Sequence, residues 1–425
     1  MLQPLGFADG TNHICKLKKA IYGLCQAARQ FYIRLDEILT EIGYVRVGID
    51  WALWLGKDGS CIASHVDDMA ACGSPEQLDS AADHIRKYLD LKDFGEISRY
   101  LGINITRRGN DYLLSQDHYI ESLLEEYDMV QCHLVSTPML SLDSLKDSES
   151  DSGLLDDNLK KKYQSLVGSL LYLVHGTRPD ISFSVIRLSQ YSSKPRMVHW
   201  IALKRILRYL KGTIKACLII KYDERQAGLI GYFDAAHADN DNRRSTCGYL
   251  FLLNSSPISW ATKVQRTVAL STTEAEFMSG TEDTKEAMFI QQITSALFQH
   301  HPLPPAELRG DNQGALALAT NPVFHPRTKH IDIRQRYISD MVNKKAITVK
   351  YVSSHDMLAD GLTKPLMKER FLIHLKQMGL ILDVSGSQSA MVMSVTNSSA
   401  LKRRFVECDV CENIFRNDIA LSQHR

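Results

Sequence analysis

Four acidic residues occupy places along the chain from which carboxylates could converge on a metal ion. Asp234 follows the predicted strand GLIGYF (residues 228–233), and Glu276 lies in the first turns of a predicted helix. Asp311 follows the short predicted strand AELRG, and Asp360 begins a segment after the predicted strand AITVKYV. Hydrolysis of a phosphodiester can use two magnesium ions about 3.5 to 4 Å apart, and magnesium prefers hard oxygen ligands. The four acids therefore suggest metal-assisted hydrolysis.

Each of these acids also has a purely structural interpretation. Glu274 and Glu276 complement the positive end of a helix dipole, and Asp311 could be a helix N-cap. Taken singly, the structural role is favoured for each acid, because the separations along the chain do not show that they meet. A fold that brings them together is needed.

Strands and helices alternate in the region that would position these acids. The predicted strands are GLIGYF (228–233), TCGYLFLL (246–253), AELRGD (306–311) and AITVKYV (346–352). The predicted helices are a long amphipathic one over 273–298 and NQGALALA over 312–319. Such alternation predicts an α/β or α+β sheet.

The composition is that of an ordinary globular protein. The chain has 425 residues, which predicts about three domains. It carries 50 Lys and Arg against 49 Asp and Glu, a formal net charge of +1, which excludes a uniformly basic nucleic-acid coat. Its apolar runs fall far short of the roughly 18 residues that cross a membrane, and its N-terminus does not resemble a secretory signal. We therefore expect an intracellular protein, cytoplasmic or nuclear, with no membrane partner.

One stretch is strongly basic despite the balanced total. Between residues 180 and 223 the sequence has Lys and Arg but no Asp or Glu. Lys204, Arg208, Lys211 and Lys215 recur there at helical spacing, opposite a face rich in leucine and isoleucine. This pattern predicts a basic amphipathic helix that could follow a phosphate backbone. The solvated face of a packed helix has the same pattern and stays an alternative.

Four segments later in the chain carry a family resemblance. They are GYFDAAHADNDNRRSTCGYLFLL, ISWATKVQRTVALSTTEAEF, DNQGALALATNPVFHPRTKHIDIR and YVSSHDMLADGLTKPL. Together they resemble the ribonuclease H domain of a copia-type retrotransposon Pol polyprotein. The resemblance implies two Mg²⁺ ions, for which Mn²⁺ could substitute, and four catalytic, metal-binding acids: Asp234, Glu276, Asp311 and Asp360.

Three positions qualify this assignment. Glu276 is chosen over Glu274 because the family places its acid just before an aromatic residue, here Phe277, and Glu274 stays an alternative. The family's SDAD is FDAA in this chain, so Ala236 replaces an acid while the first Asp is kept. His355 lies near the place of a proton-shuttling histidine, although a surface histidine is the favoured interpretation.

Earlier segments extend the resemblance. Four of them are CKLKKAIYGLCQAARQFY, SHVDDMAACG, LKDFGEISRYLGINI and LLSQDHYIESLLEEYDMV, followed by YQSLVGSLLYLVHGTRPDISFSV and HWIALKRILRYLKGT. They are similar to the second half of the reverse transcriptase of the same polyprotein and to the region that connects it to ribonuclease H. The implied fold is a partial polymerase palm and connection region, followed by a ribonuclease H-like mixed sheet flanked by helices.

Resemblance and composition together divide the chain into five predicted parts. They are a partial reverse transcriptase (1–140), a linker with a thumb or connection region (141–226), a ribonuclease H-like domain (227–383), a disordered linker (384–407) and an incomplete zinc-finger-like tail (408–425). The stretches that begin at Ser141 and Val384 are typical of linkers because they are rich in serine and lack apolar periodicity.

Asp67 and Asp68 correspond to the paired acids with which such a polymerase holds its metals. The family adds a third Asp from an earlier strand, for which this chain has no counterpart, and His65 replaces the tyrosine of its YVDD. An acidic hairpin turn between apolar strands is the alternative, because Asp suits turn geometry. We therefore expect a vestigial polymerase site and no template-directed synthesis by this chain alone.

Further basic residues flank the proposed nuclease acids. Arg243 and Arg244 lie shortly after the first acid, and Arg327, Lys329 and His330 follow the third. These side chains could neutralise phosphates on both sides of an RNA/DNA hybrid. Solvated loops are the alternative for each of them.

Zinc is less well supported than magnesium. A site made from His325, His330 and Asp332 lacks a fourth ligand at a typical spacing. The tail provides three of the four ligands of a two-Cys two-His finger: Cys408, Cys411 and His424. Either an outside group completes this site or the module is unfolded.

The sequence thus predicts a retrotransposon-derived nuclease that cuts the RNA strand of an RNA/DNA hybrid. A non-catalytic relic that only binds nucleic acid is the alternative, and Ala236 favours it. A full-length Pol protein is a possible partner, since it would supply the polymerase elements that this chain lacks.

Overall fold

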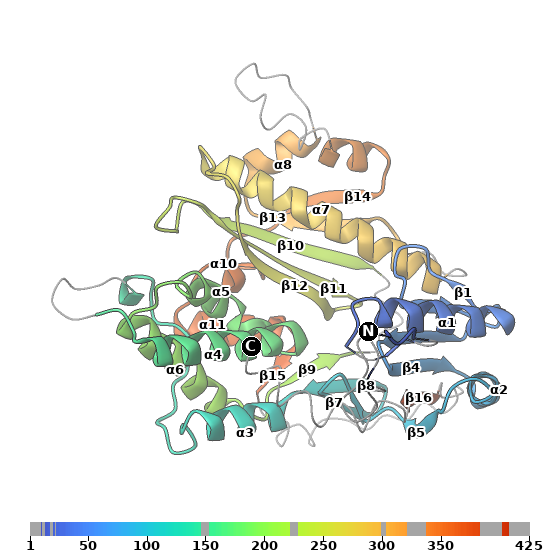
Figure 1. Ribbon diagram of the computed structural model, residues 1–425. Coiled ribbons are helices and arrows are strands. Elements are labelled where there is room, and N and C mark those ends of the chain that lie inside the picture. The colour runs from blue at the N-terminus through green and yellow to red at the C-terminus, as the bar shows by residue number, and fades with distance from the viewer. Residues whose placement is uncertain are drawn as a thin grey trace. The chain divides into compact units, whose positions relative to one another are not determined.

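The computed structural model describes most of the chain (Figure 1). The described residues are 10, 13–17, 20–21, 23–145, 153–221, 228–298, 303–320, 337–382 and 402–407. By their internal contacts they form two compact units, residues 1–100 with 395–425, and residues 101–394.

The first unit contains an antiparallel sheet of strand order β1-β2-β3-β4-β16-β5. Its elements are α1 (Ala27–Glu41), β1 (Val45–Arg46), β2 (Leu53–Leu55), β3 (Cys61–His65), β4 (Asp68–Gly73), α2 (Pro75–Ile85), β5 (Lys92–Glu96), β6 (Arg99–Tyr100) and β16 (Lys402–Glu407). Ser74 caps α2 with a reciprocal bond to Gln77, which fixes where this helix begins. Leu35, Ile38 and Trp54 are fully buried and join the helices to the sheet.

Strand β16 differs from the sequence prediction, which assigned residues 384–407 to a disordered linker. Lys402–Glu407 pairs antiparallel with both β4 and β5. The physical reason is that the facing edges of β4 and β5 carry backbone donors and acceptors that an intervening strand can satisfy.

The second unit begins with a small antiparallel sheet and a group of helices. These elements are β7 (Ile103–Arg108), β8 (Asp111–Ser115), α3 (Asp117–Glu126), η1 (Asp143–Leu145), α4 (Asp157–Gly176), η2 (Pro179–Ile181), α5 (Ser182–Ser189), α6 (Met197–Gly212), β9 (Cys217–Ile220) and, near the end of this unit, β15 (Leu380–Ile381). The strands run in the order β15-β9-β8-β7. The predicted basic helix is α6, and its leucine face is buried as expected.

A mixed five-stranded sheet forms the rest of the second unit. Its elements are β10 (Leu229–Ala236), β11 (Thr246–Leu253), β12 (Ser256–Val264), α7 (Thr272–Leu297), β13 (Ala306–Gly310), α8 (Gln313–Thr320), β14 (Ile347–Tyr351), α10 (Asp360–Thr363) and α11 (Lys368–Gln377). The strand order is β12-β11-β10-β13-β14, antiparallel from β12 to β10 and parallel from β10 to β14. This confirms the predicted fold class, a mixed sheet flanked by helices.

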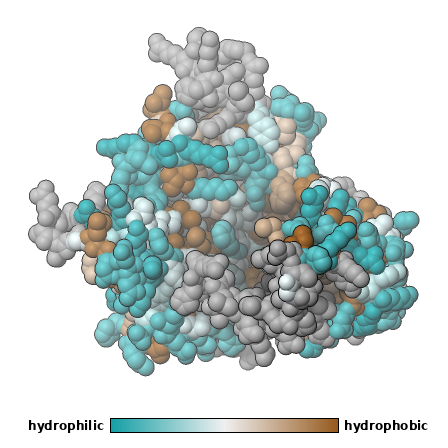
Figure 2. All heavy atoms as spheres, in the orientation of Figure 1, coloured by the Kyte–Doolittle hydropathy of each residue, from teal (hydrophilic) through white to brown (hydrophobic). Residues whose placement is uncertain are grey.

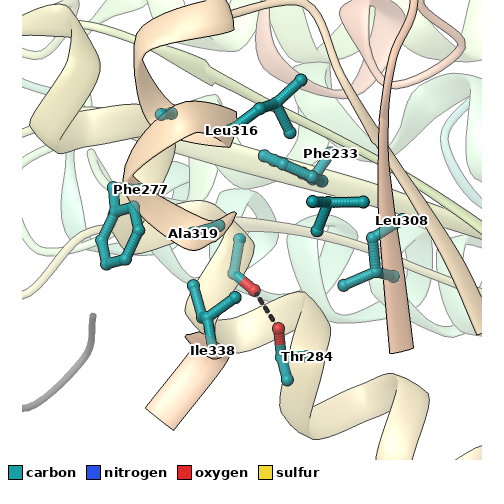
Figure 3. Close-up of a pocket in the computed structure, with 10 residues that line it drawn as sticks. Phe233, Phe277, Thr284, Leu308, Leu316, Ala319 and Ile338 are labelled. Atoms are coloured by element: carbon teal, nitrogen blue, oxygen red, sulfur yellow. Dashed lines mark hydrogen bonds between the residues drawn. The ribbon is translucent and has the colours of Figure 1, made fainter. Parts of the chain in front are cut away.

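Helix α7 runs along one face of this sheet, with α8 beside it (Figure 1). A Cβ at position 280 would lie only 3.3 Å from the Phe233 ring. The absence of a side chain at Gly280 therefore allows α7 to pack closely against the sheet. Phe233, Leu308 and Leu316 line a small cavity of about 10 Å³ between helices and sheet (Figure 3). The lining is almost entirely apolar, so this cavity belongs to the core and offers no ligand site.

The surface in view is mixed in character. Figure 2 shows brown, hydrophobic residues in small separate groups among teal, hydrophilic ones on this face. Among the helices of the described part of the chain, none combines the length and the apolar character that crossing a bilayer requires.

Candidate metal centre

Three of the four predicted acids meet at one place in the mixed sheet. Asp234 lies in β10, Glu276 in the second turn of α7, and Asp311 directly after β13. One carboxylate oxygen of each lies within 4.8 Å of the other two. The parallel pairing of β10 and β13 explains part of this geometry, because Tyr232 is opposite Arg309 and the two aspartates each follow two residues later. We call these three residues the carboxylate group.

The structure brings Glu276, not Glu274, into the carboxylate group. Ser271 is the N-cap of α7 and accepts a bond from the Glu274 backbone N–H at 3.1 Å. The Glu274 side chain turns back and accepts from the Leu270 N–H at 2.7 Å. Glu274 therefore closes the start of the helix. Two residues further, Glu276 Oε2 is buried and has no hydrogen-bond partner among the described residues.

The electrostatics of the carboxylate group favour a bound cation. Burial raises the pKa of Glu276 to about 10, and the charges of Asp234 and Asp311 add to this effect. Burial also raises the pKa of Asp234. Like charges packed together away from water are costly unless a cation or a proton joins them. The oxygen donors and the orphaned Glu276 Oε2 therefore fit a hard divalent metal.

Asp360 lies beside the carboxylate group but is held by cations of the chain. It is the first residue of α10, and its side chain is completely buried. Lys364 Nζ lies 2.8 Å from Asp360 Oδ1, and Arg370 donates to Asp360 Oδ2. The charge of Asp360 still raises the pKa of Asp234. The fourth predicted acid is therefore a neighbour of the other three, already neutralised.

Two hydroxyl groups and one arginine orient the acids, and sequence reasoning missed them. Thr363 Oγ1 donates to Asp234 Oδ2, and Ser354 Oγ donates to Asp311 Oδ2 at 2.7 Å. Arg370 bonds the Ser354 carbonyl as well as Asp360. The signal that could have indicated a partner for Asp360 is the i,i+4 spacing of a lysine after an aspartate in DGLTK.

His355, which the sequence placed near a proton-shuttling position, lies on the surface. His355 is 82% exposed in the loop after β14, and its Nδ1 lies 3.2 Å from Asp356 Oδ1. This agrees with the favoured interpretation as a surface histidine.

Asp234 does not end its strand, because β10 continues to Ala236, which pairs with Thr246 of β11. Because β10 pairs with β11 along its whole length, β10 extends beyond the apolar residues from which the strand was predicted.

The loop after β10 presents Arg243 and Arg244 to solvent. Asp239 anchors this loop by accepting from the Thr246 N–H and hydroxyl, both at 2.8 Å. Arg187 of α5 lies 3.7 Å from the same carboxylate. The two exposed arginines thus stand on a loop that Asp239 holds in place.

The basic face of α6 is partly used within the protein. Arg208 Nε donates to the His133 carbonyl at 2.8 Å, and Lys211 Nζ donates to the Cys132 carbonyl at 2.7 Å. Lys204 Nζ lies 5.5 Å from the centre of the Trp200 ring. Lys215 is exposed. For Arg208 and Lys211, holding the loop before η1 is an alternative to phosphate binding.

Asp67 and Asp68 lie at a tight hairpin turn between β3 and β4, where His65 pairs with Asp68. Val66 has φ 55°, a left-handed conformation that is unfavourable for a β-branched residue. Burial raises the pKa of Asp68, and the charge of Asp67 raises it further. In the described ranges, the only group of three or more potential metal ligands is the carboxylate group, so no third ligand joins these two aspartates there.

Several predicted ligands lie outside the described residues. They are Arg327, Lys329 and His330, the possible zinc ligands His325 and Asp332, and the tail residues Cys408, Cys411 and His424.

Comparison with known proteins gives relatives over most of the chain. The family described as "Reverse transcriptase (RNA-dependent DNA polymerase)" matches residues 1–141. The retrovirus-related Pol polyprotein from transposon RE1 of Arabidopsis thaliana is 40% identical over 378 residues, which cover 87% of this chain and 25% of the relative. The Pol polyprotein from transposon TNT 1-94 of Nicotiana tabacum is 36% identical over 386 residues, covering 87% and 28%. The chain thus spans about a quarter of these relatives.

A shorter relative is matched over nearly its whole length. The putative transposon Ty5-1 protein of Saccharomyces cerevisiae is 34% identical over 294 residues, which cover 67% of this chain and 94% of the relative. Among solved structures, ribonuclease H1 from Halobacterium salinarum has 13% identity and a TM-score of 0.25, covering 32% of this chain and 95% of its own. A foamy viral protease-reverse transcriptase has 14% identity and a TM-score of 0.20, covering 78% and 51%.

Proposed function

Because this chain belongs to the copia-type retrotransposon Pol proteins, we propose that its mixed sheet carries a ribonuclease that cuts the RNA strand of an RNA/DNA hybrid. The observation that carries the proposal is the carboxylate group, in which Asp234, Glu276 and Asp311 offer oxygens within 4.8 Å of one another. The choice of substrate follows from the chemistry of the family, since an RNA-dependent DNA polymerase leaves new DNA paired with its RNA template.

The carboxylate group would hold Mg²⁺, or Mn²⁺ in its place, with Asp360 as a further candidate ligand. Divalent metals held in this way activate water and stabilise the leaving oxygen in phosphodiester hydrolysis. The hydroxyls of Thr363 and Ser354 hold two of the acids in fixed orientations. Arg243 and Arg244 would neutralise phosphates of the bound hybrid from the exposed loop after β10.

The test is cleavage of a labelled RNA/DNA hybrid by the purified chain with Mg²⁺. We expect cleavage that EDTA abolishes, and we expect Asp234→Asn and Asp311→Asn to fall to about 1% of it or less, since even indirect metal partners are worth 10- to 100-fold. Asp340→Asn is the control, because Asp340 is exposed and pairs only with Lys344 in the described part of the chain. Equal cleavage by all variants would remove the proposal.

We propose that this chain alone does not synthesise DNA. Asp67 and Asp68 offer two carboxylates in one turn, and a two-metal site needs further ligands. A primer-extension assay that showed nucleotide incorporation by the chain alone would contradict this proposal. Mixing the chain with a full-length Pol protein tests whether such a partner supplies the missing ligands.

A non-catalytic protein that binds nucleic acid is the second candidate. The observation that favours it is the neutralisation of Asp360 by Lys364 and Arg370, together with Ala236 in place of an acid. On this alternative the chain binds the hybrid but does not cut it. Binding measured by a mobility shift, combined with no cleavage in Mg²⁺ or Mn²⁺, would favour the second candidate over the first.

A further inference from the structure

Two cations of the chain, Lys364 and Arg370, pair with Asp360, a candidate metal ligand. Its side chain is fully buried, and each carboxylate oxygen faces a different cation. Lys364 lies one helical turn after Asp360, and its side chain remains 44% exposed. The ammonium group can therefore leave Asp360 for solvent without unfolding the helix. Arg370 is tied down more firmly, because it also bonds the Ser354 carbonyl.

Lys364 also acts on Asp234. Burial lowers the pKa of Lys364, but the carboxylates of Asp234 and Asp360 raise it above its usual value overall. In return, the ammonium lowers the pKa of Asp234 against the effect of burial. Thr363, the residue before Lys364, donates directly to Asp234. The short segment 360–364 therefore contacts both acids, Asp234 through the Thr363 hydroxyl and Asp360 through the Lys364 ammonium.

The opposite side of the carboxylate group has no such cation among the described residues. Within the described ranges, neither Glu276 nor Asp311 forms an ion pair with Lys, Arg or His, whereas Asp360 forms two. Asp311 accepts a bond from the neutral hydroxyl of Ser354, and Glu276 Oε2 has no partner. Among the described residues, positive charge is thus concentrated around Asp360, and no ion pair reaches Glu276 or Asp311.

We propose that Lys364 is a built-in counter-cation that competes with a divalent metal for the carboxylate of Asp360. The inference rests on the proposed metal centre and goes beyond it by making the two metal positions unequal. A metal among Asp234, Glu276 and Asp311 displaces no cation that the described residues supply. A metal shared by Asp234 and Asp360 must first displace the ammonium of Lys364. The first position therefore fills at lower metal concentration than the second.

The test compares Lys364→Met with Lys344→Met. Methionine keeps much of the length and the apolar stem of lysine and removes its charge. Lys344 is a matched control because it forms the same i,i+4 pair with Asp340, at 2.6 Å, but on an exposed surface. Mn²⁺ binding is measured by titration calorimetry or by electron paramagnetic resonance, and the melting temperature is measured in EDTA.

We expect the unmodified chain and Lys344→Met to bind one Mn²⁺ tightly and a second weakly. Lys364→Met should bind the second Mn²⁺ roughly tenfold more tightly, on the scale of other changes around metal ligands. Without metal it should melt at a lower temperature than Lys344→Met, because Asp360 has lost a counter-cation. Mn²⁺ should raise its melting temperature more than that of the unmodified chain.

A double variant keeps the proposal testable if Lys364→Met fails to fold. Asp360→Asn with Lys364→Met removes both charges, so it should fold and bind one Mn²⁺ only. Two sites with unchanged affinity in either variant would overturn the role of Lys364 and leave the metal centre standing. Absence of Mn²⁺ binding in every protein would overturn the metal centre itself, and this inference with it.

Discussion

The chain contains two acidic sites that differ in how their carboxylates come together. In the first unit, Asp67 and Asp68 are neighbours in one hairpin turn. In the second, Asp234, Glu276 and Asp311 come from two strands and a helix and meet only because the sheet and α7 are packed. A pair that is adjacent in sequence is easy to recognise but supplies only two ligands. The carboxylate group is made of residues remote in sequence, so it exists only in the folded chain, where it is a candidate cation site.

The largest effect on hybrid cleavage should come from neutralising an acid of the carboxylate group. Glu276→Gln should reduce hybrid cleavage about 100-fold or more, because it removes one of three carboxylates that converge on the proposed metal. Asp67→Asn with Asp68→Asn should leave cleavage within a factor of about two, because the hairpin acids have no part in the proposed nuclease. Cleavage by both variants is measured as the initial rate on the same labelled hybrid.

Glu274→Gln is the matched control for that change, on the same helix and with the same loss of charge. Glu274 accepts from the Leu270 N–H, and glutamine can still accept this bond. Cleavage should therefore be retained, with a loss of stability of at most about 1 kcal/mol. If Glu274→Gln abolished cleavage and Glu276→Gln did not, the assignment of the second acid would be reversed.

The next effect separates two sets of basic residues. Replacing Arg243 and Arg244 by alanine should weaken hybrid binding roughly tenfold and lower the slope of log affinity against log salt by about 2, one for each phosphate that is no longer neutralised. Replacing Arg208 and Lys211 should instead lower the melting temperature, because both hold backbone carbonyls. An unchanged salt slope in the first variant would place the hybrid elsewhere.

A smaller effect concerns the pH dependence of stability without metal. The pKa of Glu276 rises from 4.5 to about 10, chiefly through burial. Between these values the unfolded chain loses this proton and the folded chain keeps it, so stability falls as pH rises. The slope from this group is at most about 1.4 kcal/mol per pH unit. Melting in EDTA from pH 5 to pH 9 should show a shallower slope for Glu276→Gln, and equal slopes would contradict the shift.

The fold was largely predictable because its elements have clear local patterns. The strands at 246–253 and 346–352 are short apolar stretches, and the helix predicted at 273–298 differs from α7 by one residue at each end. The extent of β10 was not predictable, because Asp234 and Ala236 lie in the strand only through pairing with β11. Strand β16 depends on the same kind of remote pairing and was missed for that reason.

The candidate site was predictable in its residue types but not in its contacts. Family resemblance identified four acids, but the sequence has no information on which of them share space. The contacts of Thr363, Ser354 and Arg370 depend on how α10 and α11 pack against the sheet. Charge neutralisation of Asp360 is likewise a tertiary property, and only the spacing to Lys364 is visible in the sequence.

A second buried acid on α7 sharpens the comparison with Glu276. Asp283 is 1% exposed, and neither carboxylate oxygen has a hydrogen-bond partner among the described residues. Burial raises its pKa well above the usual value, against the opposing effect of Lys263. Unlike Glu276, it belongs to no group of potential metal ligands in the described ranges. Burial of the Asp283 carboxyl group therefore lowers the free energy of unfolding, and no metal site among the described residues uses it.

Asp283→Ala should consequently raise the free energy of unfolding, by about 1 kcal/mol, because it removes an unsatisfied buried carboxyl and alanine favours the helix. Chemical denaturation at pH 7 in EDTA measures the change. Hybrid cleavage should not change, since Asp283 is not part of the carboxylate group. A loss of cleavage at full stability would show that Asp283 serves the site, and buried acids on α7 would then have one role instead of two.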